Sequence, residues 1–122
     1  MERTLFHASS HLFGEASEGA VITLNPGTQN AQGLGVYCSL GSPDVRASDS
    51  VHEHGLKTMF VVTVTDSKKY WYQSKGCRDR KKSRPQTWHT KGASLEVIVE
   101  AVSTVTDSFG TYLKVEGKAA RV

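Results

Sequence analysis

The sequence has little cysteine and no long hydrophobic run. Cys38 and Cys77 are the only two cysteines among 122 residues, and they give no zinc-type spacing, no Cys-x-x-Cys pair and no disulfide-dense framework. No stretch approaches the length of a membrane span, and the first residues lack the apolar run of a signal peptide. We therefore expect no metal, no membrane partner, and a cytoplasmic protein or one delivered to a host or target cell without a cleaved signal peptide.

The composition predicts one modest globular domain that covers residues 1–122. Hydrophobic residues make up 38% and charged residues 22%, which is far from a disordered composition. There is no internal repeat and no alternation of strands with helices. An α+β fold with a mainly antiparallel sheet and a few short helices is therefore expected.

Apolar and β-branched runs predict six or seven short strands. Two short helices are expected at 10–18 and 42–54, the second because Ser42-Pro43-Asp44 is typical of a helix start. Residues 74–93 are polar and basic without a clear period, and they predict a loop. The expected strands cover residues 3–7, 20–24, 36–38, 59–64, 69–72, 95–102 and 111–115.

Three residues stand out as candidates for chemistry. His7 ends the first predicted strand, and Tyr37 follows Gly33-Leu34-Gly35-Val36, where glycine permits a close approach of another chain or a ligand. Glu96 lies inside an apolar strand, where a carboxylate must face solvent, a partner or a cleft. Each also has a structural interpretation: a satisfied histidine, a core ring and a solvent-facing glutamate.

Taken in order, these segments resemble the motifs of the His-Tyr-Glu class of ADP-ribosyltransferases, which includes the poly(ADP-ribose) polymerases. Leu5-Phe6-His7-Ala8-Ser9 resembles the first motif, Gly33-Leu34-Gly35-Val36-Tyr37 the second, and Ser94-Leu95-Glu96-Val97 the third. The resemblance runs from about residue 5 to residue 115. Ala8 departs from the usual glycine, and alanine can supply the same backbone groups if its φ is negative.

The resemblance implies a split antiparallel sheet that binds NAD, as co-substrate, in its cleft. It implies that Glu96 stabilises the ribose as positive charge develops there, and that His7 bonds a ribose hydroxyl. Tyr37 would stack on the nicotinamide ring. Ala8, Ser9 and Gly35 would complete the NAD site: the Ala8 backbone by reading the carboxamide, and Ser9 by a hydroxyl contact.

The acceptor of ADP-ribose is open between nucleic acid, RNA among the candidates, and protein. Ser94 stands where arginine-modifying relatives of the wider superfamily have Glu or Gln, so arginine is disfavoured. A basic segment precedes Glu96, and it suits a phosphate backbone with an aromatic ring nearby for a base, although a solvated loop is an equal alternative. The acceptor-binding candidates are Arg78, Arg80, Lys81, Lys82 and Trp88, with Lys75 and Arg84 in the same basic run.

The resulting hypothesis is a mono-ADP-ribosyltransferase that releases nicotinamide. It would be a toxin or an effector, and a toxin would have a neutralising partner. One alternative is an NAD glycohydrolase, in which water replaces the acceptor. Another is a non-catalytic module that binds nucleic acid through its basic segment.

Overall fold

A computed structural model describes residues 2–27, 34–45, 48–65, 70–73 and 86–121. Within these residues the strands form one curled sheet in the order β2-β7-β8-β4-β1-β3-β6-β5. Neighbouring strands are antiparallel except β4 and β8, which are parallel. The strands are β1 (Arg3–Ser9), β2 (Val21–Leu24), β3 (Tyr37–Leu40), β4 (Thr58–Val64), β5 (Tyr72–Gln73), β6 (Gln86–His89), β7 (Leu95–Asp107) and β8 (Gly110–Arg121).

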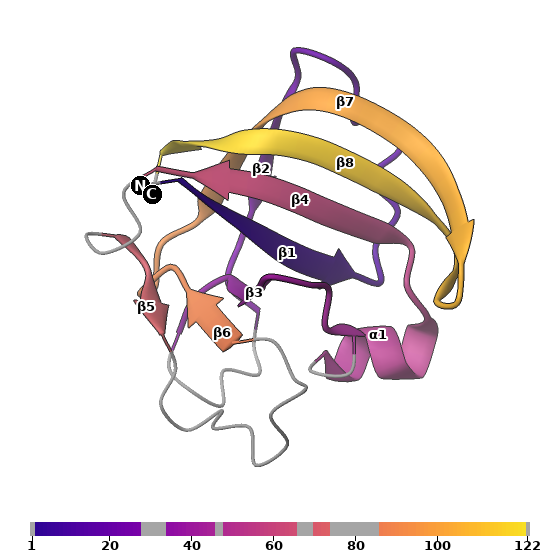
Figure 1. The fold of residues 1–122 in the computed structure, drawn as a ribbon, viewed down its shortest axis with the longest axis horizontal. Coiled ribbons are helices and arrows are strands. Elements are labelled where there is room, and N and C mark those ends of the chain that lie inside the picture. Colours follow the sequence, from indigo (N-terminus) through magenta and orange to yellow (C-terminus); the bar gives the residue numbers. More distant parts are fainter. Residues whose placement is uncertain (1, 28–33, 46–47, 66–69, 74–85, 122) are drawn as a thin grey trace.

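The curl of the sheet separates its two ends in space. In Figure 1, β7, β8, β4 and β1 form a curved upper layer, while β5 and β6 lie below it at the left. The helix α1 (Asp49–His54) lies at the lower right. The fold is thus mainly β, and the described strands make one mixed sheet rather than two separate halves.

The core has two parts because strand residues alternate between the faces of the sheet. On one face Leu5, Phe60 and Val97 belong to the larger cluster, which also holds Cys38 and Trp88. Burial raises the pKa of the Cys38 thiol, so this cysteine is neutral.

The second cluster lies on the other face of β1 and β4, under α1. Met59 and Tyr112 are buried there with Val51 of α1, and Phe6 and Ala8 pack against them. The helix therefore covers the face of the sheet opposite the larger cluster.

The long β7–β8 hairpin carries a bulge between Val99 and Ala101. The bulge lets Val97 and Val99 before it and Val102 after it all reach the larger core cluster. Gly117, opposite Val99, has no room for a side chain, since an added Cβ would lie 2.3 Å from the carbonyl oxygen of Ile98. This close approach is why a glycine stands in the middle of β8.

Several sequence-based expectations about elements are corrected. Residues 10–18 form turns rather than a helix, because Phe13 packs edge-on against Phe60 at 4.9 Å and Thr58 bonds both His11 and Phe13. α1 begins at Asp49 rather than near residue 42. β6 lies within the segment expected to be a loop, and β7 and β8 are longer than predicted.

The burial pattern of β4 agrees with the sequence. Its residues Thr58, Met59 and Phe60 are buried, as are Val62 and Val64, which matches the expectation of a strand covered on both faces. No helix in the described part of the chain is long and apolar enough to cross a membrane.

Candidate functional site

The ladder between β1 and β3 ends after two pairs, and the place where these two strands part is here called the opening. These strands are paired only at Leu5–Leu40 and Phe6–Ser39, whereas β1 is paired with β4 over all seven of its residues. Beyond Phe6 the imidazole of His7 bridges the two strands: its Nδ1 lies 2.6 Å from the carbonyl oxygen of Tyr37. His7 and Tyr37 are therefore brought into contact through the main chain of Tyr37 rather than through its ring.

This hydrogen bond determines the tautomer of His7. A carbonyl oxygen only accepts, so Nδ1 carries the proton and donates it. Burial, which includes the Phe60 ring at 6.1 Å, lowers the pKa of His7, and the bond to the Tyr37 carbonyl opposes that shift only in part. The imidazole is therefore neutral at pH 7, and its Nε2 is an acceptor that suits a hydroxyl donor.

The ring of Tyr37 belongs to a row of three aromatic side chains. Tyr37 and Tyr72 are both paired with His89, from β3 on one side and β5 on the other. The Tyr37 and His89 rings stack at 5.2 Å with an angle of 20°, and the Tyr72 ring lies 5.2 Å from His89 at 51°. This row, here called the aromatic row, extends from the opening beside His7 to the edge of the sheet.

Thr90 ties the start of β3 to the turn that precedes β7. The backbone N–H of Val36 donates to the Thr90 hydroxyl at 3.0 Å, and that hydroxyl donates to the carbonyl of Ala93 at 2.5 Å. Tyr37 follows Val36 directly, and Glu96 lies three residues after Ala93. The buried Thr90 thus joins the start of β3 to the turn at residues 90–93, which leads into β7.

Gly35 makes this junction possible. A Cβ at residue 35 would lie 2.9 Å from Nδ1 of His89 and 3.1 Å from the backbone nitrogen of Thr90. The sequence suggested a close approach at this glycine, and the structure shows that the neighbour is the chain itself.

Glu96 lies on the face of β7 that turns away from the larger core cluster. It alternates with Leu95 and Val97, which are fully buried, and it is itself only partly buried. Its strand neighbours are Thr23 in β2 and Arg121 in β8. Tyr37 also leaves the core face, because the next residue, Cys38, is a core residue, whereas His7 shares the face of Leu5 and of its strand partner Phe60. No side-chain contact in the described part of the chain joins the Glu96 carboxylate to either His7 or Tyr37.

Ala8 and Ser9 continue β1 past His7. Ala8 has a negative φ, since Lys91 is the only described non-glycine residue with a positive one, so its backbone groups are presented without strain. The Ser9 hydroxyl accepts a hydrogen bond from the backbone of His11 at 3.1 Å, and its carbonyl accepts one from Lys57. Ser9 therefore helps to fix the turn that follows the strand.

The acceptor-binding candidates fall into two groups. Arg78, Arg80, Lys81 and Lys82 lie outside the described residues. Trp88 belongs to the larger core cluster at 9% exposure, with the Arg3 guanidinium 5.6 Å from its ring centre. Its ring faces other core residues, so it does not offer a surface on which a base could stack.

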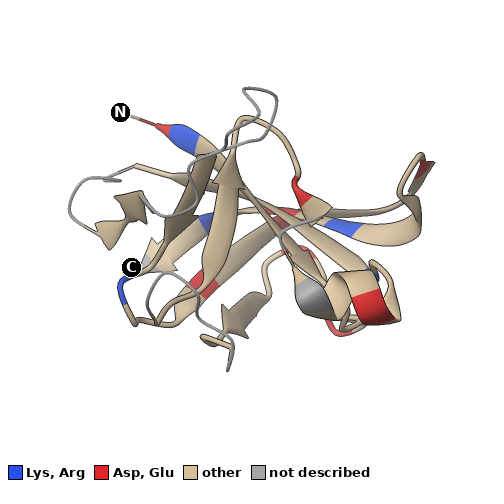
Figure 2. Cartoon of the chain, turned by 90° about the horizontal axis from the view of Figure 1, so that it is seen from below, with Lys and Arg blue, Asp and Glu red and all other residues tan. Residues whose placement is uncertain are grey.

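Charge is divided unevenly along the chain. The described ranges hold six of the fifteen Lys and Arg residues and ten of the twelve Asp and Glu residues, a formal charge of −4. The remaining ranges carry +7, which gives the total of +3. Figure 2 shows the described charges spread over separate elements, so the basic character of the protein comes from the other ranges.

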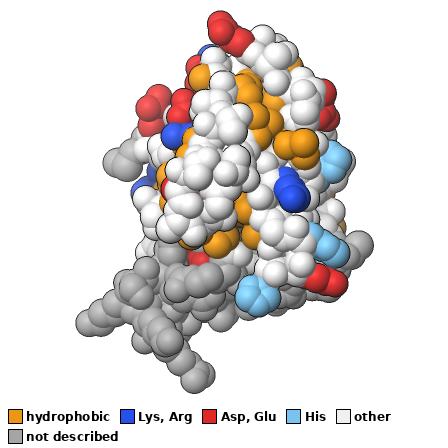
Figure 3. Space-filling view, turned by 90° about the vertical axis from the view of Figure 1, so that its right-hand side faces the viewer, with side chains coloured by type: hydrophobic (Ala, Val, Ile, Leu, Met, Phe, Trp, Pro, Cys, Tyr) orange, Lys and Arg blue, Asp and Glu red, His pale blue; other side chains and the backbone are white. Residues whose placement is uncertain are grey.

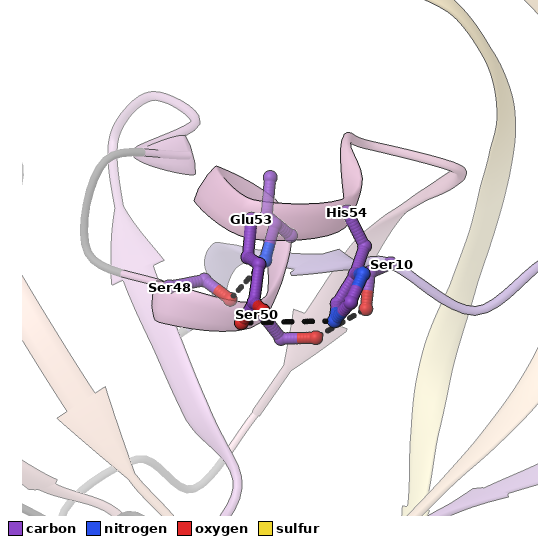
Figure 4. A network of polar contacts seen from close by, with 6 residues as sticks. Ser10, Ser48, Ser50, Glu53 and His54 are labelled. Atoms are coloured by element: carbon purple, nitrogen blue, oxygen red, sulfur yellow. Dashed lines mark hydrogen bonds and ion pairs between the residues drawn. The ribbon is translucent and has the colours of Figure 1, made fainter.

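The face of the molecule around α1 carries several histidines. His11, His52 and His54 are exposed, and Figure 3 shows histidine side chains gathered on this face. Ser10, just after β1, bonds Ser50 of α1, and Figure 4 shows this contact beside the His54–Glu53 ion pair of 3.7 Å. No group of three or more His, Cys, Asp and Glu suited to a metal occurs among the described residues.

Comparisons with protein-family models, curated proteins and solved structures found no match to this chain. The geometry itself adds residues that the sequence did not single out. Thr90 and Tyr72 lie in segments without a motif, and His89 lay in a presumed loop. The pairing of His89 with Tyr37 depends on β6, whose apolar content is too low to have been predicted from its pattern.

Proposed function

We propose that the protein is an NAD-dependent mono-ADP-ribosyltransferase that transfers ADP-ribose to a macromolecule and releases nicotinamide. The observation that carries this proposal is the hydrogen bond from His7 to the Tyr37 carbonyl where β1 and β3 part. It links two of the three motif residues, His7 and Tyr37, where the pairing of β1 and β3 ends.

His7 would hold the sugar. With Nδ1–H donated to the Tyr37 carbonyl, the neutral ring has one acceptor left, Nε2, and a ribose hydroxyl is a matching donor. A protonated ring would lose that acceptor. Burial therefore keeps His7 in the form that binds the sugar at neutral pH.

Glu96 would act on the reacting bond. The bond between ribose C1′ and the nicotinamide nitrogen breaks, and its electron pair leaves with nicotinamide while positive charge develops on the ribose. A carboxylate near the ribose 2′-hydroxyl stabilises this charge most strongly in the transition state. The acceptor then donates an electron pair to C1′ and gives up a proton. The Thr90 bridge supports this role, because it anchors the turn that leads into the Glu96 strand to the start of β3.

The test uses NAD labelled in the ADP-ribose part, a cell lysate, and the variants Glu96→Gln and Glu100→Gln. Glu96→Gln is expected to reduce labelling of macromolecules by about 10²–10³-fold. Glu100 is an exposed carboxylate on the same strand, at the bulge, and its variant should label like the wild type. Equal labelling by Glu96→Gln and wild type would contradict the proposal.

The same assay separates the alternatives. Glu96-dependent nicotinamide release without a labelled macromolecule would identify an NAD glycohydrolase. Nucleic-acid binding with neither labelling nor nicotinamide release would identify a non-catalytic module.

A further inference from the structure

An exposed tyrosine stands at the outer end of the aromatic row. β5 is the edge strand of the sheet, and both of its residues are exposed, with Tyr72 41% exposed. The inner side of the Tyr72 ring contacts His89, which is buried. Tyr72 is thus a large aromatic surface that is supported from behind and open to solvent.

The position of Tyr72 relates it to the candidate site. Tyr72, His89 and Tyr37 occupy three neighbouring strands in register, so Tyr72 and Tyr37 lie two strand spacings apart, about 10 Å. A planar group stacked on Tyr72 would lie within a nucleotide or two of the opening beside His7. Trp88, the aromatic residue that the sequence suggested for this role, is buried in the core.

The charge of the chain favours a polyanion as its ligand. Six Lys and Arg residues occur between residues 75 and 84, shortly after β5 in sequence. Phosphates are attracted by such a run without a fixed geometry. An exposed aromatic ring together with a cationic run in the same chain is the combination that binds single strands, since every base has a π-face whereas bases in a duplex are already stacked.

We infer that Tyr72 is a stacking site for an unpaired base and that the acceptor is a single-stranded nucleic acid. The inference deepens the proposed function. Its claim that the nucleic acid is the acceptor rests on that function. The ring of Tyr72 provides the surface, and His89 and Tyr37 hold it in place through the aromatic row. A base on Tyr72 would bring a neighbouring nucleotide to the opening where His7 and Tyr37 meet.

The experiment measures fluorescence anisotropy of labelled single-stranded RNA and DNA oligonucleotides and of a matching duplex, with the full chain and no NAD. Tyr72→Ala should weaken single-strand binding by about 5- to 150-fold, the loss expected for one stacked base. Tyr72→Phe keeps the ring and should bind like the wild type. Phe109→Ala is the matched control, because Phe109 is equally exposed, at 43%, in the distant β7–β8 turn.

Four outcomes would overturn the inference: unchanged binding by Tyr72→Ala, an equal loss of binding in Tyr72→Phe, a Tyr72-dependent preference for duplex, or transfer of labelled ADP-ribose from NAD to protein instead of nucleic acid. Nicotinamide release by wild type and Glu96→Gln is measured in parallel. Tyr72-dependent binding without Glu96-dependent release would keep the stacking site and reject the transferase. Glu96-dependent release without Tyr72-dependent binding would support the transferase and reject the stacking site.

Discussion

His7 shows how one hydrogen bond at a strand end can prepare a side chain for binding. The carbonyl of Tyr37 has lost its partner in the ladder, because β1 and β3 separate after Phe6 and Ser39. The imidazole replaces that partner and is thereby fixed in orientation and tautomer. The same contact thus satisfies a backbone group and leaves Nε2 as the acceptor.

The lowered pKa of His7 predicts a pH dependence of stability. The folded state binds the His7 proton less readily than the unfolded state, whose pKa is about 6.5. Its contribution to stability is therefore complete above about pH 6.5 and is lost as the pH falls from there toward the folded pKa, by up to about 1.4 kcal/mol per pH unit. His7→Gln should remove this contribution to the change in the free energy of unfolding with pH.

Urea unfolding between pH 5 and pH 8, a range of about three units around the histidine pKa, measures the effect. His52→Gln is the control, since His52 is an exposed residue of α1. If both variants change the pH dependence of stability equally, the half-buried ring of His7 is not its source.

Gly35 gives a second prediction at the scale of one residue. Gly35→Ala would place a methyl group 2.9 Å from Nδ1 of His89, so either the Tyr37–His89 stack or Thr90 must shift. We expect a loss of about 1–3 kcal/mol in the free energy of unfolding, as for overpacked cores. Gly14→Ala is the matched control, because nothing lies within 4 Å of its added Cβ. Equal stability of the two variants in chemical denaturation would show that a methyl group fits at residue 35.

At the scale of elements, α1 depends on its ends because it has only six residues. The Ser48 hydroxyl accepts a hydrogen bond from the backbone of Val51 at 3.2 Å, and Gly55 ends the helix with a φ of 86°. A short helix gains little from its own hydrogen bonds, so the cap and the packing of Val51 decide whether it forms.

Ser48→Ala should therefore lower the free energy of unfolding by about 1 kcal/mol. Thermal unfolding followed by circular dichroism measures the change. Ser42→Ala is the control, because exposed Ser42 offers its backbone carbonyl to Ser39 and this contact survives the substitution. A Tm for Ser48→Ala that equals that of Ser42→Ala would argue against the cap.

The β7–β8 turn is stabilised in another way. Tyr112 donates its hydroxyl to Asp107 at 2.6 Å, and burial together with this bond raises the pKa of Tyr112 to about 12. Gly110 takes a φ of 106°, which a side chain would resist. The hairpin that carries Glu96 at its far end is thus closed by side-chain contacts as well as by its ladder.

At the scale of the whole molecule, the division of charge predicts how binding depends on salt. Positive charge is concentrated in residues 75–84, while the described part of the chain is net negative. The triple variant Arg80→Ala, Lys81→Ala and Lys82→Ala should weaken transfer to nucleic acid and leave NAD binding unchanged. For single strands, the slope of log K against log salt should fall by about 2.

Oligonucleotide titrations at several salt concentrations and NAD titrations test both parts. The double variant Glu15→Gln and Glu18→Gln is the control, because it also changes the net charge but at positions far in sequence from residues 75–84. If the slope of log K against log salt is the same in the triple variant and the wild type, these cations do not contact phosphates.

The sequence by itself determined the apolar runs of β1, β2, β4 and β7, because burial on one or both faces leaves a pattern in a single strand. It also singled out His7, Tyr37 and Glu96 as unusual at their positions. It did not indicate β6, the aromatic row or the Thr90 bridge, since these arise from pairing between segments far apart in the chain. Only the tertiary structure decided that Trp88 is a core residue while Tyr72 is exposed, because which face of a strand is buried depends on its partners and not on its own residues.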